Sequence, residues 1–183
     1  MRALLSALCL GLGIIGAGPA AAQSGIERPF ALVDGSGRSV TDRDFRGRWL
    51  LMFFGYTSCP DICPTTLSEI ATVMDQLGPL AARVQPIFVS VDPQRDAPAL
   101  LREYVDAFGA GIEGLTGTEE QVARAASTFG VLFYKIPGNS PHDYTVAHSA
   151  LIYAIGPERG LVTRFSADAN ADRIAATLRL LVQ

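Results

Sequence analysis

The chain has 183 residues, of which 49% are hydrophobic and 18% are charged, and its formal net charge is -3 at pH 7. This balance is typical of a folded globular protein and excludes a chain that is disordered over most of its length. The basic residues form no long runs, so the positive patch expected of a protein that binds nucleic acid or anionic lipid is missing. We therefore expect no nucleic-acid partner, and contact with a membrane only through the N-terminal segment.

The first 22 residues have the three parts of a secretory signal peptide. Arg2 gives a positive start, residues 3–17 are apolar, and small alanines lead to a cleavage site after Ala22. An uncleaved membrane anchor is the alternative, because a spanning helix needs about 20 apolar residues, although several glycines and Pro19 disfavour such a helix. We expect a signal peptide over 1–22 and a single domain over 23–183, exported to the periplasm.

The first predicted elements of this domain are a hairpin and a buried strand. Residues 30–33 and 38–40 flank the turn-forming sequence of residues 34–37, which predicts two paired strands. Residues 49–54 are an unbroken run of large apolar side chains, typical of a central strand with both faces buried.

The rest of the chain alternates between predicted helices and strands. In order, we expect a helix over 65–77, a strand over 84–91, a helix over 97–108, a helix over 118–129 that opens with a capping box, a strand over 131–136, a strand hairpin of 149–155 and 161–165, and a helix over 171–182. This order predicts an α/β domain with three layers, a central mixed sheet and an N-terminal β-hairpin. It matches the thioredoxin-like arrangement.

Two cysteines follow the buried strand, in Gly55-Tyr-Thr-Ser-Cys59-Pro-Asp-Ile-Cys63-Pro. Sites in α/β proteins lie beyond the carboxyl ends of strands, which is where this segment is expected. Each cysteine precedes a proline, which disfavours helical backbone angles, so we expect both thiols on a tight loop open to solvent on one side. With Pro64 near the first helical position, the helix N-terminus should lower the pKa of the Cys63 thiol.

Activated thiols suit either a redox disulfide or a metal, and the Cys-x3-Cys spacing does not choose between them. A purely structural disulfide would close too short a loop to stabilise the fold much. His148 is expected immediately before a strand, after a loop over 137–143 that packs beside the cysteines, which makes its imidazole a candidate third ligand. Two thiolates and an imidazole suit copper. A structural zinc site takes four protein ligands, and three are evident here unless His142 is the fourth.

Asp92 and Asp96 flank Pro93 at the end of a predicted strand. Carboxylates in such a position commonly form a turn and cap the helix that follows, and we expect that role here. A part in orienting the cysteine site is the alternative.

Three segments carry a further pattern: Phe53-Phe54-Gly55-Tyr56-Thr57-Ser58-Cys59-Pro60-Asp61-Ile62-Cys63-Pro64-Thr65, then Ser90-Val91-Asp92-Pro93-Gln94-Arg95-Asp96-Ala97-Pro98, and then Asp143-Tyr144 leading to His148-Ser149. In this order they resemble the Sco/SenC family of copper-binding, thioredoxin-like proteins. The resemblance implies that Cys59, Cys63 and His148 bind one copper ion, as Cu(I) or Cu(II). Ala147 departs from the family pattern, which usually has an acidic residue beside the histidine.

The resemblance also implies a function, that of a metallochaperone in cytochrome c oxidase assembly. The family is associated with the dinuclear copper centre of oxidase subunit II, either by handing over copper or by reducing the cysteines of that site. Subunit II or another copper-accepting protein is then the partner, together with a thiol reductant, because copper loads only when both thiols are reduced. Two alternatives remain: a thiol-disulfide oxidoreductase with Cys59 and Cys63 as catalytic residues, and a copper or redox sensor.

Overall fold

The computed structural model describes residues 28–140, 143–158 and 160–182. The predicted signal peptide over 1–22 and His142 lie outside the described residues. The elements are β1 (Ala31–Asp34), β2 (Ser39–Thr41), the 3-10 helix η1 (Asp42–Phe45), β3 (Trp49–Gly55), α1 (Ile62–Leu77), the 3-10 helix η2 (Gly78–Arg83), β4 (Val84–Ser90), α2 (Pro98–Asp106), β5 (Glu113–Thr116), α3 (Glu119–Phe129), β6 (Phe133–Pro137), β7 (Tyr144–His148), β8 (Leu151–Ile155), β9 (Leu161–Ser166) and α4 (Ala171–Leu181).

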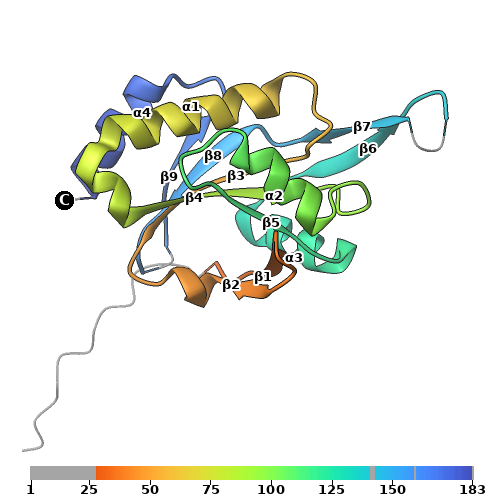
Figure 1. Ribbon diagram of the computed structural model, residues 1–183, viewed down its shortest axis with the longest axis horizontal. Coiled ribbons are helices and arrows are strands. Elements are labelled where there is room, and N and C mark those ends of the chain that lie inside the picture. Colours follow the sequence, from red (N-terminus) through yellow and green to blue (C-terminus); the bar gives the residue numbers. More distant parts are fainter. Residues whose placement is uncertain (1–27, 141–142, 159, 183) are drawn as a thin grey trace, which may run out of the picture.

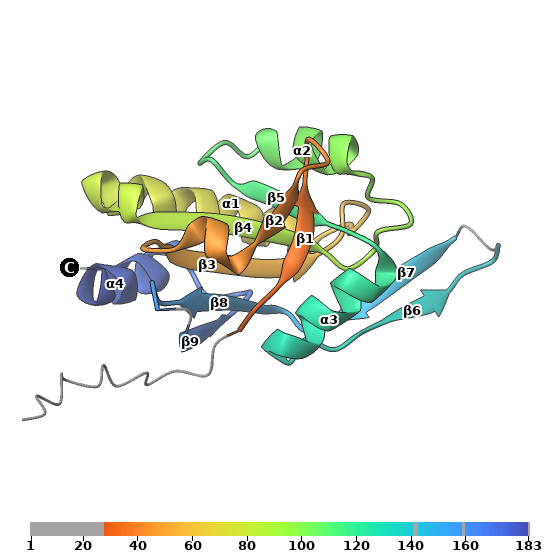
Figure 2. The same cartoon turned by 90° about the horizontal axis from the view of Figure 1, so that it is seen from below.

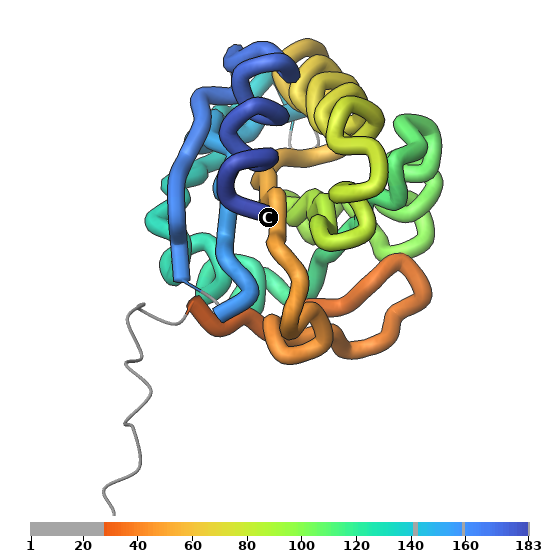
Figure 3. Tube along the Cα trace, turned by 90° about the vertical axis from the view of Figure 1, so that its left-hand side faces the viewer, coloured from red at the N-terminus to blue at the C-terminus, as the bar shows by residue number. Residues whose placement is uncertain are grey.

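Seven strands form one mixed sheet in the order β2-β1-β5-β4-β3-β8-β9. The central strands β3, β4 and β5 are parallel, and the flanking strands pair antiparallel. Helices α1 and α4 lie side by side on one face of the sheet, and α3 lies on the other (Figures 1 and 3). The predicted α/β fold with three layers and an N-terminal hairpin is confirmed.

The apolar runs of the sequence form the centre of this sheet. Every residue of β3 and of β4 is buried, because helices cover both faces of the parallel strands and leave no solvated side. Thr118 and Gln121 form the predicted capping box at the start of α3, which satisfies backbone N–H groups that have no partner within the helix.

Two strands were not predicted from the sequence. β5 is short and contains Gly114, so it lacks the apolar run that marked β3. β7 occupies residues 144–148, for which no element was predicted, and it pairs with β6 as a separate two-stranded sheet. This β6–β7 arm extends beyond the body of the domain (Figures 1 and 2). His148 is the last residue of β7 and, as expected, precedes the next strand, β8.

Helix α1 begins earlier than predicted. Cys63 lies in its first turn and only Cys59 lies on the preceding loop, so the expectation that both thiols lie on a loop is wrong. Pro64 does not prevent this helix start, because the N–H groups of a first turn have no partner within the helix and the missing one costs nothing. Among the described residues, no helix is both long and apolar enough to cross a bilayer.

Candidate metal centre

The structure brings Cys59, Cys63 and His148 together beyond the carboxyl end of β3. Cys59 lies on the loop after β3, Cys63 lies in the first turn of α1, and His148 ends β7. The two Sγ atoms and an imidazole nitrogen all lie within 4.8 Å of one another. His148 Nε2 is 3.6 Å from Cys63 Sγ. The cluster therefore presents two sulfur atoms and one nitrogen to a common point.

The surroundings of His148 favour a neutral imidazole. The rings of Phe53 and Tyr56 meet it edge-on, each with its centroid 6.0 Å away. Burial lowers its pKa from the usual 6.5, because desolvation disfavours the charged ring. Nδ1 lies 3.3 Å from the Ser149 carbonyl oxygen, and a proton on Nδ1 that is donated to this oxygen leaves the Nε2 lone pair directed at the sulfurs.

Cys63 is fully buried at the back of the cluster. Burial is the largest effect on the pKa of its thiol and raises it. A hydrogen bond with the Tyr56 backbone lowers this pKa and one with Cys59 raises it, so that the net change is upward. The prediction that the α1 N-terminus lowers this pKa is therefore wrong in sign, because the loss of water outweighs the partial charge of a helix end. A metal ion must displace a proton from this sulfur in order to bind.

The cluster lies beside a hollow that opens to solvent. The hollow is lined by the cysteine loop and α1 on one side (Tyr56, Cys59, Ile62) and by β7 on the other (Val146, Ala147, His148). Cys59 and His148 reach this opening, whereas Cys63 lies behind them. Both cysteines are free thiols in the structure. A ligand from another protein would therefore meet Cys59 and His148 first.

The loop Asp92–Asp96 lies beside the cluster and contacts both the cysteine segment and β7. The Asp96 carboxylate accepts hydrogen bonds from Thr57 N at 3.0 Å, from Thr57 Oγ1 at 2.6 Å and from Ser90 Oγ at 2.6 Å. The carboxylate of Asp92 accepts a hydrogen bond from the Tyr144 hydroxyl at 2.8 Å and pairs with Arg95. These contacts tie the loop to the cysteine segment and to β7.

The expected capping role of the two aspartates is wrong, although their turn is present. Ala97 is the N-cap of α2, and no side chain caps it, because both carboxylates are buried and turned toward the site. The Asp92 carbonyl does accept the backbone N–H groups of Arg95 and Asp96. The supporting roles of Thr57 and Tyr144 were missed, since nothing in their spacing shows which distant carboxylate they meet. Arg95, which pairs with Asp92 in the same loop, was missed as well.

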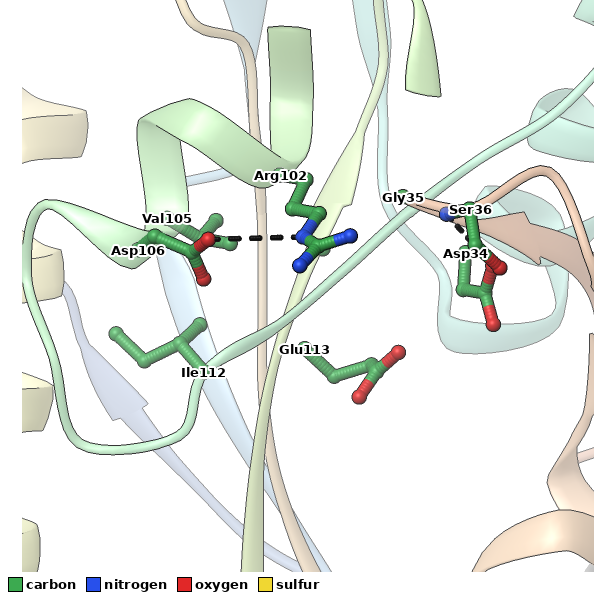
Figure 4. A pocket seen from close by; sticks show the side chains of 9 residues that line it. Asp34, Gly35, Ser36, Arg102, Val105, Asp106, Ile112 and Glu113 are labelled. Atoms are coloured by element: carbon green, nitrogen blue, oxygen red, sulfur yellow. Dashed lines mark hydrogen bonds and ion pairs between the residues drawn. The ribbon is translucent and has the colours of Figure 1, made fainter. Parts of the chain in front are cut away.

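A second hollow lies between α2, the β1–β2 turn and the start of β5 (Figure 4). Its charged side chains include Asp34, Arg102, Asp106 and Glu113, and Arg102 pairs with Asp106 at 3.7 Å. Burial raises the pKa of Glu113 there, and the nearby Asp34 raises it further. No thiol or imidazole is among the described residues that line it, so it lacks soft ligands for a transition metal.

Comparison with known proteins agrees with this geometry. A family model described as SCO1/SenC matches residues 18–183. The chain belongs to the SCO1/SenC family. The human mitochondrial protein SCO1 homolog is 36% identical over 152 residues, which are 82% of this chain and 50% of that protein. The mouse mitochondrial protein SCO2 homolog is 39% identical, over 82% of this chain and 60% of that protein. The chain thus spans roughly half of these curated family members.

Solved structures of SCO1/SenC proteins share the fold. The structure of Bradyrhizobium japonicum ScoI with copper bound is 40% identical with a TM-score of 0.77, over 83% of this chain and 96% of that one. Arabidopsis thaliana ScoI with copper bound is 34% identical with a TM-score of 0.77, over 82% of this chain and 93% of that one. Both were solved with the metal that the donor atoms of this cluster suit.

Proposed function

We propose that the protein is a periplasmic copper chaperone that binds one copper ion through Cys59, Cys63 and His148 and passes it to an acceptor protein. The observation that carries this proposal is the grouping of two sulfurs and one imidazole nitrogen within 4.8 Å at the edge of a solvent-facing hollow. The copper-bound ScoI structures of two relatives support it.

The donor set suits copper in both oxidation states. Thiolates are soft ligands that favour Cu(I), and an imidazole adds the nitrogen that Cu(II) accepts readily. Three protein ligands are one fewer than the usual structural zinc site has. A site of three ligands leaves room for an incoming ligand, as transfer to another protein requires.

The burial of each ligand suggests the order of transfer. An acceptor that enters through the hollow replaces His148 and Cys59 first, because these two reach the opening. Cys63 holds the ion last, from the interior. When that bond breaks, the raised pKa of Cys63 favours the return of a proton to its sulfur, and the regained proton makes rebinding of the ion less favourable.

The acceptor that we propose is subunit II of cytochrome c oxidase, or another protein with a copper site built from cysteines. A thiol reductant is required as a second partner, because copper cannot bind to a Cys59–Cys63 disulfide. The periplasmic location and the removal of residues 1–22 rest on the signal-peptide pattern alone.

Reduction of a protein disulfide is the second candidate function. The proximity of the Cys59 and Cys63 thiols, whose sulfurs lie within 4.8 Å of each other, favours it, because two adjacent thiols are needed to reduce a disulfide. The raised pKa of Cys63 disfavours Cys63 as the attacking group, since the thiolate is the nucleophile. Cys59 would then attack and Cys63 would resolve the mixed disulfide.

A copper titration of the reduced protein tests the proposal, with Cys59→Ser, Cys63→Ser and His148→Ala as variants and His142→Ala as the matched control. We expect one copper per chain in the wild type and in the control. His148→Ala should lose Cu(II) binding and its thiolate-to-copper absorption while circular dichroism shows an unchanged fold. Unchanged copper binding in His148→Ala, with retained reduction of a target disulfide, would favour the oxidoreductase instead.

A further inference from the structure

We propose that Tyr144 is a positioning residue for Cu(II): its phenol fastens β7 to the Asp92–Asp96 loop and so holds the His148 imidazole against the cysteine loop. The inference deepens the proposed function and rests on it.

The strand that carries His148 is not part of the main sheet. Among the residues that the structure describes, β7 pairs with β6 alone, in a two-stranded sheet that is separate from the seven-stranded sheet. Cys59 and Cys63 directly follow β3, which lies in the middle of the main sheet. The carboxyl end of β7 is fixed by β8, which begins three residues after His148 and pairs with β3. The rest of β7 depends on contacts outside the main sheet (Figures 1 and 2).

Tyr144 makes the contacts that fix β7 over the loop. Its hydroxyl donates to the fully buried Asp92 carboxylate at 2.8 Å, and its carbonyl accepts from Arg95 Nη1 at 2.9 Å. The Arg95 guanidinium lies 3.8 Å from the ring centroid and Lys135 Nζ lies 4.6 Å from it. Lys135 in turn donates to the Gln94 side chain at 2.5 Å. Charge-assisted bonds and cation–π contacts of this kind are the stronger polar contacts in proteins.

The same loop also holds the cysteine segment. Asp96 accepts two hydrogen bonds from Thr57, two residues before Cys59. Alternation along β7 places Tyr144, Val146 and His148 on one face, and Val146 is buried in the hollow wall. One short loop thus connects the segment that carries Cys59 to the strand that carries His148.

The two oxidation states should respond differently when this connection is weakened. Cu(I) is soft and is well bound by two thiolates alone, whereas Cu(II) depends more on the imidazole. Residues that orient a metal ligand typically change metal affinity by about 10–100-fold when they are altered. A looser β7 should therefore weaken Cu(II) more than Cu(I), and the copper potential should rise.

The test compares Tyr144→Phe with Tyr134→Phe in the full mature chain. The first variant removes only the hydroxyl and keeps the ring between Arg95 and Lys135. The second removes a hydroxyl from the neighbouring strand, where Tyr134 is 64% exposed and pairs with Ala147. Affinities for Cu(I) and Cu(II) are measured by competition with a chelator, together with the thiolate-to-Cu(II) absorption and the copper potential.

We expect Tyr144→Phe to bind Cu(II) about tenfold more weakly, with an altered absorption band and Cu(I) affinity within about threefold of wild type. The lower Cu(II) affinity should raise the potential by up to about 59 mV, the value of a tenfold change in a one-electron couple. Tyr134→Phe should match wild type. Equal losses for both oxidation states, equal effects of the two variants, or no effect of Tyr144→Phe would each overturn the inference.

The wild-type titration separates this inference from the proposed function. If the wild type fails to bind one copper ion, the proposed function fails. If it binds copper and Tyr144→Phe binds Cu(II) equally well, only the role of Tyr144 is wrong. Should Tyr144→Phe not fold, the loop-side variant Gln94→Ala removes the bond to Lys135, together with the exposed bond to Glu119, without changing charge. We then expect a two- to threefold loss of Cu(II) affinity, and unchanged affinity overturns the inference.

Discussion

Cys59 and Cys63 are separated by three residues and yet have different surroundings. Cys59 lines the hollow, and Cys63 is fully buried between Gly55 and Cys59. The enclosed sulfur is a protonated thiol at neutral pH because its pKa is raised. Binding a metal ion there must release at least one proton per ion, which makes copper affinity depend on pH.

We expect copper affinity to rise about tenfold or more per pH unit between pH 7 and 9, since free Cys63 is protonated and bound Cys63 is not. His148 adds no slope in this range, because its lowered pKa keeps it neutral above 6.5. Competition titrations at several pH values measure the slope, and Cys63→Ser should reduce it. A flat profile would show that Cys63 is already a thiolate in the free protein.

Gly55 lets Cys63 approach the end of β3. A Cβ at this position would lie 2.6 Å from Cys63 Sγ and 2.8 Å from the Phe88 ring. Gly55→Ala should therefore displace the sulfur, lower the free energy of unfolding by about 1–3 kcal/mol and weaken copper binding. Urea unfolding and copper titration check both effects.

Gly156→Ala is the control for Gly55→Ala, since its Cβ would have no neighbour closer than 3.3 Å. In a Cys63→Ala background the cost of Gly55→Ala should fall, because one of the two crowding atoms is gone. An undiminished cost would mean that Phe88 alone resists the added methyl group.

At the scale of elements, the turn between β1 and β2 depends on one carboxylate. Asp34 accepts hydrogen bonds from the backbone and side chain of Ser36 and of Arg38. Burial would raise the pKa of Asp34, but these bonds outweigh it and lower the pKa from 3.8 to about 2. The ionised carboxylate therefore stabilises the hairpin at neutral pH.

Asp34→Asn should lower the free energy of unfolding at pH 7 by about 1.5–3 kcal/mol, the range for hydrogen bonds to a charged group. The folded pKa is depressed, so this contribution is present above about pH 4 and is lost as pH falls toward about 2. Urea unfolding of both proteins at several pH values should show the difference shrinking on acidification. The exposed control Asp75→Asn should differ little from wild type, and a constant difference for Asp34→Asn would contradict the assignment.

Hairpins with clear turn residues were predicted from the sequence, whereas the strands β5 and β7 were not. The hairpins β1–β2 and β8–β9 were predicted, because turn residues separate two apolar segments that pair with each other. β7 was not predicted, since its Tyr-Thr-Val-Ala-His sequence follows a long polar loop and it pairs with β6 outside the main sheet. β5 was not predicted, because it has four residues including a glycine and so lacks a run of apolar or alternating side chains long enough to indicate a strand, although Leu115 and Thr116 are buried.

At the scale of the whole molecule, the amino-acid sequence alone predicted the α/β class, the three layers and the family to which the cysteine motif belongs. Each depends on neighbours in the chain: apolar runs, capping residues, turn residues and the Cys-x3-Cys spacing. Folding alone established how closely His148 approaches the sulfurs, the upward shift of the Cys63 pKa and the inward turn of Asp92 and Asp96. Desolvation and long-range contacts arise when distant segments pack together, and local patterns do not report them.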